Sequence, residues 1–476
     1  LHRLIRRQRQ MCIRDSIICI YYGCYFYCIG GMKMKEKLYS NKNLLYLFIP
    51  LVIEQGLEYL VGFADSLMVA KVGEAAVSGV SLVDFVMALL ISIFTALATG
   101  GGAITGQYLG SKKDNEANQS ALQMMKVTFY LSIVITLIIF VFKNSILHLL
   151  FGSISSDVYH HAMTYLNVVV LSIPFLAIYN GGAAIFRTMN NSKLPMQIML
   201  VMNIVNVIGN ALCVFILKMG VEGIAIPTLV SRVGAALLIL YFSKKTTIHL
   251  SQLMNIKINR NMIEKILNIG IPFGIENSMF YLGRLIVLSI VSLFGTASIA
   301  ANSVGGTLVM FQVLPGTAIN LGLTSIISRC IGANDYDQAK YYTKKINRWM
   351  HISFIISTVI ILLLMPLIMS FYNLSSRATS YVWQIIILHG IMMTLIWPYG
   401  YMLPVIFRSS GDAKFPMIVS IISMVICRIL FSYILAVIFN MGMMGTWYAM
   451  FLDWIVKAII YTCLLYTSPS PRDSTS

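Results

Sequence analysis

The stretch LFIPLVIEQG at residues 47–56 recurs as IGIPFGIENS at residues 269–278, and this repeat decides the fold. Pro50 matches Pro272, so the two copies lie 222 residues apart. Nearly the same spacing relates further landmarks: Gly73 and Gly295, Gly110 and Gly332, Arg187 and Arg408, Pro195 and Pro416, Gly220 and Gly442. A spacing that holds along the whole chain indicates an internal duplication, so we interpret the chain as two homologous halves.

Long apolar runs surround these landmarks. The sequence is 58% hydrophobic and only 11% charged, with a mean hydropathy of +0.79, whereas a soluble domain carries about 25% charged residues. Twelve segments reach spanning length: 44–69, 77–108, 121–142, 160–184, 194–217, 221–242, 266–293, 298–327, 350–372, 381–406, 415–439 and 443–465. They predict an all-α polytopic membrane protein with twelve transmembrane helices.

Each half carries six predicted helices. Six is an even number, so both halves cross the membrane in the same sense, and we expect two lobes related by a pseudo-two-fold axis along the membrane normal, with a cleft between them. We assign residues 32–242 to an N-lobe (helices 1–6), residues 243–265 to a cytoplasmic linker and residues 266–465 to a C-lobe (helices 7–12). The polar, Arg- and Ser-bearing ends make us expect residues 1–31 and 466–476 to be non-native extensions.

The formal net charge of +17 is distributed unevenly over the loops. One set of alternate loops holds most of the Lys and Arg, and the other holds Lys71, Lys143, Lys218 and Arg377. Positive-inside retention therefore places both termini in the cytoplasm of a bacterial cell, with the chain in its inner membrane. No nucleic-acid partner is needed to explain the charge. The eight Cys show no paired spacing, so we expect neither a metal site nor disulfides.

Three acids stand within the first predicted helix. At 100° per residue, Glu54, Glu58 and Asp65 fall within about 40° of one another on one face. Ionisable groups at membrane depth usually face a cavity or a partner, so we expect these acids to line a cavity and take part in coupling.

An amide stripe runs along the predicted fifth helix. Asn203, Asn206 and Asn210 lie within about 60° of one another. Facing carboxylate and amide oxygens suit a hard cation such as Na⁺, or a proton held on a carboxylate. Hydrogen bonding between helices remains an alternative role for the amides.

The second half carries different polar groups. Glu276 is the repeat counterpart of Glu54, and it is a further coupling candidate near Arg284, which either neutralises it or approaches the cavity. Arg428 and Asp453 are expected to form a structural ion pair, because neither is stable alone in a membrane. Pro50 removes a helical hydrogen bond and creates either a hinge or a static kink.

Several motifs together resemble the multidrug and toxic compound extrusion (MATE) family from about residue 44 to 460. The motifs are FADSLMV (63–69), GQYLGSKKDNEA (106–117), FRTMNNSKLPM (186–196), IPFGIEN (271–277), GTASIAANSV (295–304), GANDYDQA (332–339) and RSSGDAKFPM (408–417). The resemblance implies an antiporter that expels amphiphilic, often cationic, drugs or metabolites by alternating access, driven by Na⁺ or H⁺. It implies no cofactor besides that ion, a small-molecule substrate and a monomer in the bilayer.

The resemblance also implies a cation site in the N-lobe. The family positions correspond here to Asp65, Asn206, Asn210 and Thr228, and Glu276 matches the family's acidic residue in helix 7. Asn210 departs from the pattern, since the family often has Asp there, and this leaves Na⁺ and H⁺ both open as the coupling ion. We expect Asp65 to take up the cation from outside while helix 1 bends near Pro50.

Three other functions compete with this one. A flippase for lipid-linked oligosaccharides belongs to the same superfamily, but a more cationic cavity is expected of it. An intramembrane enzyme needs clustered catalytic groups, and the sequence shows no such motif, so we expect no enzyme. A channel fits poorly with a two-lobed repeat.

Overall fold

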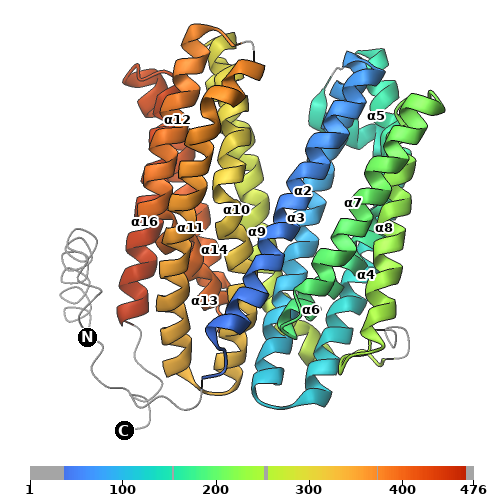
Figure 1. The fold of residues 1–476 in the computed structure, drawn as a ribbon, viewed down its shortest axis with the longest axis vertical. Helices are drawn as coiled ribbons and strands as arrows, with labels where there is room; N and C mark the ends of the chain where they lie inside the picture. The colour runs from blue at the N-terminus through green and yellow to red at the C-terminus, as the bar shows by residue number, and fades with distance from the viewer. Residues whose placement is uncertain (1–36, 153–154, 251–255, 373, 468–476) are drawn as a thin grey trace.

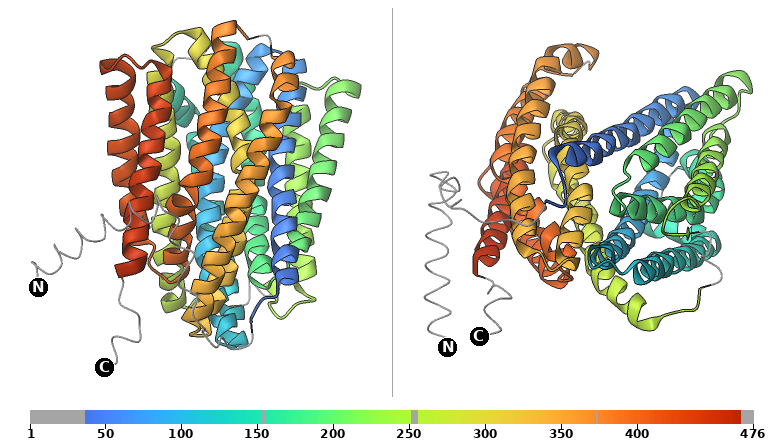
Figure 2. Two further views of the ribbon diagram at one scale, coloured as in Figure 1. Left: turned by 60° about the vertical axis from the view of Figure 1, so that its left-hand side comes forward. Right: turned by 60° about the horizontal axis from the view of Figure 1, so that its bottom comes forward.

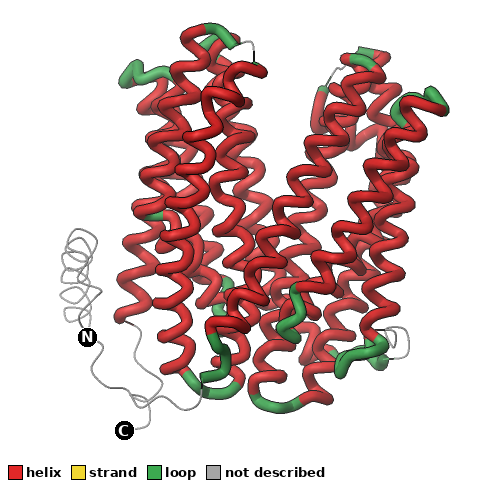
Figure 3. The backbone as a smooth tube through the Cα atoms, in the orientation of Figure 1, coloured by secondary structure: helices red, strands yellow, loops and turns green. Residues whose placement is uncertain are grey.

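The described chain is helical (Figure 3). The computed structural model describes residues 37–152, 155–250, 256–372 and 374–467. Twelve helical segments within them are long and apolar enough to cross a membrane, so the predicted number of spans is confirmed. The predicted extension 1–31 and residues 468–476 of the predicted tail lie outside the described residues.

The first six spans form one lobe (Figure 1). They are α2 Asn41–Val72, α3 Glu74–Gly110, α4 Asp114–Phe151, α5 Ser156–Val169 with the 3-10 turn η2 Val170–Ser172 and α6 Ile173–Thr188, α7 Lys193–Ala211 with the π-helical turn η3 Leu212–Ile216, and α8 Glu222–Ser243. The helices extend beyond the predicted apolar runs because polar residues stabilise their ends. In α4, for example, Asp114 and Glu116 occupy the first turn, where a negative charge is favourable.

The last six spans form the second lobe. They are α9 Arg260–Ser292, α10 Thr296–Gly332, α11 Tyr336–Phe371, α12 Ser376–Leu395 with η5 Pro398–Met402 and α13 Leu403–Ser409, α14 Lys414–Ser423 with η6 Met424–Leu430, α15 Phe431–Tyr433 and η7 Ile434–Ile438, and α16 Met443–Thr467. Helix α9 begins inside the predicted linker 243–265, because the Asn259 side chain caps it by accepting from the backbone N–H of Met262 at 3.2 Å.

The two lobes diverge toward the top of Figure 1 and meet at the bottom, where the segment between α8 and α9 lies (Figure 2). Helix α3 packs against α9 and α10 across the lobe boundary, and α2 packs against α10. We call these two regions the divergent end and the closed end.

Helix α2 belongs to both lobes. Its first turns are buried in the same hydrophobic cluster as C-lobe residues of α10 and α11, and its last turn joins an N-lobe cluster with α3. The residues in the C-lobe cluster are Leu44, Leu47, Phe48 and Leu51, and the residue in the N-lobe cluster is Val69. The start of the predicted N-lobe therefore packs as part of the C-lobe core.

Glycines bring α3 and α10 together at the closed end. A Cβ atom on Gly110 would overlap the carbonyl oxygen of Arg329, and a Cβ on Gly332 would overlap that of Gln107. These contacts are repeat counterparts of each other, so the pseudo-two-fold axis passes between the two helix ends. Only glycine permits this close approach of two backbones.

Two reciprocal hydrogen bonds accompany the glycine contact. Gln107 Nε2 donates to the carbonyl oxygen of Ser409 at 2.8 Å, and Arg329 Nε donates to that of Thr188 at 2.9 Å. Each bond joins one lobe to the other. Residues 107 and 329 are repeat counterparts, as are 188 and 409, so the closed end is held symmetrically.

Tyr39, just before α2, adds a third link between the lobes. Its backbone N–H donates to the Tyr342 hydroxyl at 2.7 Å, and its own hydroxyl donates to Asn190 Oδ1 at 3.0 Å. Burial raises the pKa of Tyr39, so its hydroxyl stays protonated and remains a donor.

We predict that Gly332→Val separates the lobes at the closed end, because the added side chain has no room beside α3. Spin labels at the exposed positions 113 and 340 are then expected to lie further apart than in the wild type, as measured by double electron–electron resonance. Gly306→Val is the control, since nothing lies within 4 Å of a Cβ at Gly306 on the same helix. An unchanged distance in the Gly332 variant would contradict the role of this contact.

Candidate functional site

A polar cluster lies between α2, α7 and α8 in the N-lobe. Asn210 Nδ2 donates to Asp65 Oδ1 at 2.7 Å and lies 3.2 Å from Asn206 Oδ1. Asn206 Nδ2 donates to Thr228 Oγ1 at 3.0 Å. The structure thus brings together all four residues predicted for the cation site. Both asparagines and Thr228 are buried, and Asp65 is partly buried.

Local packing explains this arrangement. Gly209 on α7 leaves room for α8, since a Cβ there would lie 2.7 Å from the ring of Pro227. Thr228 donates its own hydroxyl hydrogen to the carbonyl oxygen of Ile224 at 2.9 Å, which leaves its lone pairs for Asn206. Asn203, one turn before the cluster, donates to the carbonyl oxygen of Leu57 at 2.8 Å and ties α7 to α2.

One oxygen of the cluster has no donor. Asn210 Oδ1 is buried without a hydrogen-bond partner among the described residues. A buried acceptor without a donor is costly. A turn of the Asn210 amide would bring this oxygen toward the Asp65 carboxylate, where a cation would contact both. Hard cations prefer carboxylate and amide oxygens, so the donor set fits Na⁺ and also fits a proton on Asp65.

Two charged residues within the N-lobe spans escaped the sequence analysis, Asp84 on α3 and Arg232 on α8. Tyr165 donates to Asp84 Oδ1 at 3.4 Å, and Arg232 donates to Ser172 Oγ at 2.7 Å. Each is an ionisable residue in the interior of an apolar span, which is the signal that would have identified it.

The three acids of α2 do not share one cavity, contrary to the prediction. Glu54 is 1% exposed and pairs with Arg187 of α6 at 2.5 Å. Glu58 is exposed and, among the described residues, accepts from Gln55 of its own helix at 3.1 Å. Asp65 alone joins the amide cluster. Residues on one face of a helix point in the same direction. Glu54, Glu58 and Asp65 lie at different positions along α2, so they meet different neighbouring helices.

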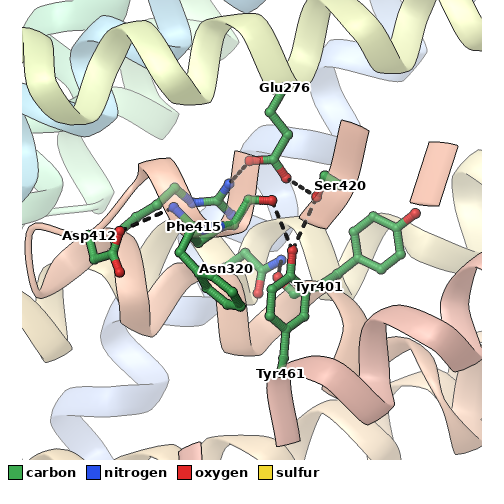
Figure 4. Close-up of polar contacts among 9 residues, drawn as sticks. Glu276, Asn320, Tyr401, Asp412, Phe415, Ser420 and Tyr461 are labelled. Carbon is green, nitrogen blue, oxygen red and sulfur yellow. Dashed lines mark hydrogen bonds and ion pairs between the residues drawn. The ribbon is translucent and has the colours of Figure 1, made fainter. Parts of the chain in front are cut away.

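Glu276 occupies the equivalent place in the C-lobe (Figure 4). It pairs with Arg408 at 2.8 Å and accepts from Ser420 at 2.8 Å, and Ser420 Oγ lies 3.2 Å from the Tyr461 hydroxyl. The partner of Glu276 is therefore Arg408, and Arg284 forms no ion pair with it. Arg187 and Arg408 stand near helix ends, but both guanidinium groups turn inward to their glutamates.

Tyrosines support both ion pairs. Tyr179 donates to the carbonyl oxygen of Pro195 at 3.1 Å and lies 3.4 Å from Glu54 Oε1. Tyr461 donates to the carbonyl oxygen of Pro416 at 3.1 Å. The two prolines are repeat counterparts, although the tyrosines come from different spans of their lobes.

The predicted ion pair between Arg428 and Asp453 is wrong. Asp453 pairs with Lys457 at 3.0 Å and accepts from Ser423 at 2.5 Å. Lys457 lies one turn further along the same helix, which brings its amine to the carboxylate without any displacement of backbone. The guanidinium of Arg428 lies over the ring of Phe280, 5.3 Å from its centroid.

Pro50 and Pro272 lie inside the continuous helices α2 and α9. Pro50 lies one residue before Leu51, the last α2 residue in the C-lobe cluster, and one turn before Glu54. This position suits the predicted hinge, which stays a prediction.

The MatE family model matches residues 50–212 and 272–434, two segments that begin 222 residues apart like the internal repeat. The chain therefore belongs to the MatE family, whose members are membrane transporters and not enzymes.

Similar proteins come from bacteria. The chain is 28% identical over 438 residues to the "Uncharacterized transporter YisQ" of Bacillus subtilis, which covers 90% of this chain and 94% of that protein. It is 22% identical over 434 residues to the "Probable multidrug resistance protein NorM" of Thermotoga maritima, covering 88% of this chain and 91% of that protein. The names of such relatives do not favour the flippase alternative.

Solved structures share the fold. One, described as the outward-facing conformation of a multidrug resistance MATE family transporter of the MOP superfamily, aligns with a TM-score of 0.82 at 19% identity over 90% of this chain and 97% of that one. Another, a MATE crystal structure in the bent conformation, has a TM-score of 0.81 at 19% identity and covers 91% and 97% of the two chains. The predicted architecture of two six-helix lobes is confirmed.

The Glu54–Arg187 and Glu276–Arg408 ion pairs predict that breaking either one destabilises the protein to a similar extent. Glu54→Gln and Glu276→Gln each leave an arginine inside the protein without its counter-charge, and we expect each to lower the free energy of unfolding by about 3–5 kcal/mol. Thermal unfolding of the purified protein in detergent measures this. Glu58→Gln, at an exposed acid of the same helix as Glu54, is expected to change it little. A large effect at only one of the two pairs would show that they are not equivalent.

Proposed function

We propose that this protein is a cation-coupled antiporter that exports amphiphilic, often cationic, small molecules across the bacterial inner membrane by alternating access. The observation that carries the proposal is the cluster of Asp65, Asn206, Asn210 and Thr228, which combines a carboxylate with amide and hydroxyl oxygens inside the N-lobe. The names of the multidrug resistance relatives support the class of substrate.

The shape of the molecule supports the direction of transport. With both termini in the cytoplasm, as the loop charges predict, the closed end faces the cytoplasm and the divergent end faces outward. Asp65 lies in the half of α2 that approaches the divergent end, about 22 Å along the helix from Pro50 at 1.5 Å per residue. A cation from outside therefore reaches Asp65 while the cytoplasmic side is sealed.

The chemistry of coupling follows from the cluster. In this structure the Asn210 amide donates a hydrogen bond to Asp65, which stabilises the negative charge of the carboxylate. A bound Na⁺ requires the amide of Asn210 to present its oxygen instead, and a bound proton converts Asp65 from an acceptor to a donor. Either event changes the hydrogen bonds that join α2 to α7, and this links cation uptake to a movement of α2.

The proposal is tested with everted membrane vesicles loaded with Na⁺ or acidified inside, and with ethidium as the transported dye. Uptake driven by one of the two gradients is expected for the wild type, and its loss for Asp65→Asn, because the neutral amide holds neither ion. Asp157→Asn, at an exposed acid of α5, is the control and should transport normally. Wild-type rates for Asp65→Asn would refute the assignment.

A second prediction concerns the missing carboxylate. Asn210→Asp adds a negative charge beside Asp65, and we expect Na⁺ to bind about tenfold more tightly, since ligand charge sets cation affinity. The readout is the NaCl concentration that half-maximally raises the thermal unfolding temperature, compared with choline chloride. Asn203→Asp, on the same helix but bonded to a backbone carbonyl, is the control. No difference between the two variants would contradict a cation site at Asn210.

A further inference from the structure

A cleft of about 450 Å³ lies between the two lobes at the closed end. Its N-lobe wall is the last part of α3, and its C-lobe wall combines the start of α9 with the end of α10. Ile104 and Ile269 are buried and form an apolar base. Gly332, which lies against α3, also lines the cleft, so the two walls stay together only while the lobes meet at this end.

The cleft also carries an aromatic ring and a cation, which come from opposite lobes. Lys265 of α9 donates from Nζ to the Tyr108 hydroxyl of α3 at 3.3 Å and lies over the Tyr108 ring, 5.8 Å from its centroid. Among the described residues that line the cleft, Lys265 alone is charged. The acids that follow the lining residues in sequence, Asp335 and Asp412, each accept from a backbone N–H three residues further on. The cleft thus offers a ring to stack on and an ammonium group to donate a hydrogen bond.

The internal repeat relates this cleft to a region that the protein fills itself. Gly411 lines the cleft, and its repeat counterpart is Asn190. Tyr108 likewise has Cys330 as its counterpart. The Tyr39 hydroxyl donates to Asn190 Oδ1 at 3.0 Å, and the Tyr39 side chain, 4% exposed, is buried in the same cluster as Cys330. On that side of the pseudo-two-fold axis a phenol group therefore occupies the place that is open in the cleft.

Two differences between the halves leave the cleft open. The residue 222 positions after Tyr39 is Asn261, and it belongs to α9 and lines a different pocket together with Gln123 of α4. Gly411 has no side chain, and a Cβ there would find no atom within 4 Å. No described residue thus takes the place of Tyr39 in the cleft.

Tyr39 shows what kind of group this place holds. Its ring is buried, and its hydroxyl joins the C-lobe core to Asn190 of the N-lobe. A phenol in the cleft would stack on the Tyr108 ring and accept a hydrogen bond from Lys265, which has a formal charge and is therefore a strong donor. A volume of about 450 Å³ with an apolar base and few polar groups suits a small aromatic molecule.

We propose that this cleft is a regulatory site that binds small phenols from the cytoplasm, and that the bound phenol holds the closed end shut. This inference rests on the proposed function, because alternating access requires the closed end to open in each cycle. A ligand that contacts both walls only while the lobes meet stabilises that state and slows the cycle.

Two matched probes test the site by saturation-transfer difference NMR on the purified full chain in detergent. N-acetyltyrosinamide carries a phenol like that of Tyr39, and N-acetylphenylalaninamide lacks only the hydroxyl. We expect the wild type to bind the tyrosine probe about fivefold more tightly, and Lys265→Met to remove this preference. Lys244→Met, at an exposed lysine outside the cleft, is the control and should keep it.

A second variant tests the position of the site without changing its charge. Asn268→Trp places a large side chain at an exposed residue that lines the cleft, and it should weaken the binding of both probes. If Lys265→Met fails to fold, this variant decides, since wild-type affinity for the tyrosine probe in Asn268→Trp would overturn the site. Equal binding of the two probes to the wild type would overturn it as well.

Transport tests the regulatory role, because everted vesicles expose the cytoplasmic face to the medium. N-acetyltyrosinamide added to the medium is expected to lower ethidium uptake by the wild type about twofold at half-saturation of the site. Each variant is compared with its own rate without the probe, and Lys265→Met uptake should not respond. Probe binding that depends on Lys265 but leaves uptake unchanged would overturn the regulatory role. Absence of ethidium uptake without any probe would instead overturn the export proposal, and the NMR titration would still decide whether the site exists.

Discussion

An ionisable side chain inside a bilayer is stable only beside a partner, and the interior of this protein is organised by that requirement. Glu54 ties α2 to α6 through Arg187, and Glu276 ties α9 to α13 through Arg408. Asp453 is neutralised within α16. These pairs give each of the three acids a cationic partner. Among the described residues of the spans, the ionisable groups without an ion pair include Glu58, Asp65, Asp84, Arg232, Arg284 and Arg428.

The repeat preserves the ion pairs Glu54–Arg187 and Glu276–Arg408, but it does not preserve the Asp65 cluster. Near the closed end the two halves use the same residues: an acid after the proline of the first helix, an arginine at the end of the fourth span, and glycines between the lobes. Toward the divergent end they differ, with Asp65 opposite Val287 and Asn206 opposite Arg428. Both lobes must pack and meet in the same way, so their contacts stay symmetric. A ligand contacts each lobe with a different part of its surface, and nothing requires those parts to match.

The sequence predicted the scaffold well because the signals were local or periodic. Spans follow from the length of apolar runs, the two lobes follow from the spacing of prolines and glycines, and the Asp65 cluster follows from helical faces and family motifs. The ion pairs were different. Arg187 stands at a helix end, where its charge looks like a loop cation, and only the folded chain shows that its long side chain turns inward to Glu54. Likewise Asp453 pairs with Lys457 of its own helix rather than with Arg428. Asp84 could have been identified from the sequence, as an ionisable residue in an apolar span, but its hydrogen bond with Tyr165 could not.

Helix α2 connects the site to the closed end. Below Pro50 its side chains are buried in the C-lobe core, and above it Glu54 is fixed to α6 and Asp65 to α7. Relative motion of the lobes therefore acts on α2 between Leu51 and Glu54, within one turn of the proline. The backbone nitrogen of Pro50 donates no hydrogen bond to the carbonyl of Tyr46, so the helix is weakened in the turn that leads into Leu51. A bend near Pro50 would keep the Glu54–Arg187 pair intact, because both residues belong to the N-lobe, and under the proposed function it would transmit a change at Asp65 to the contacts of the closed end.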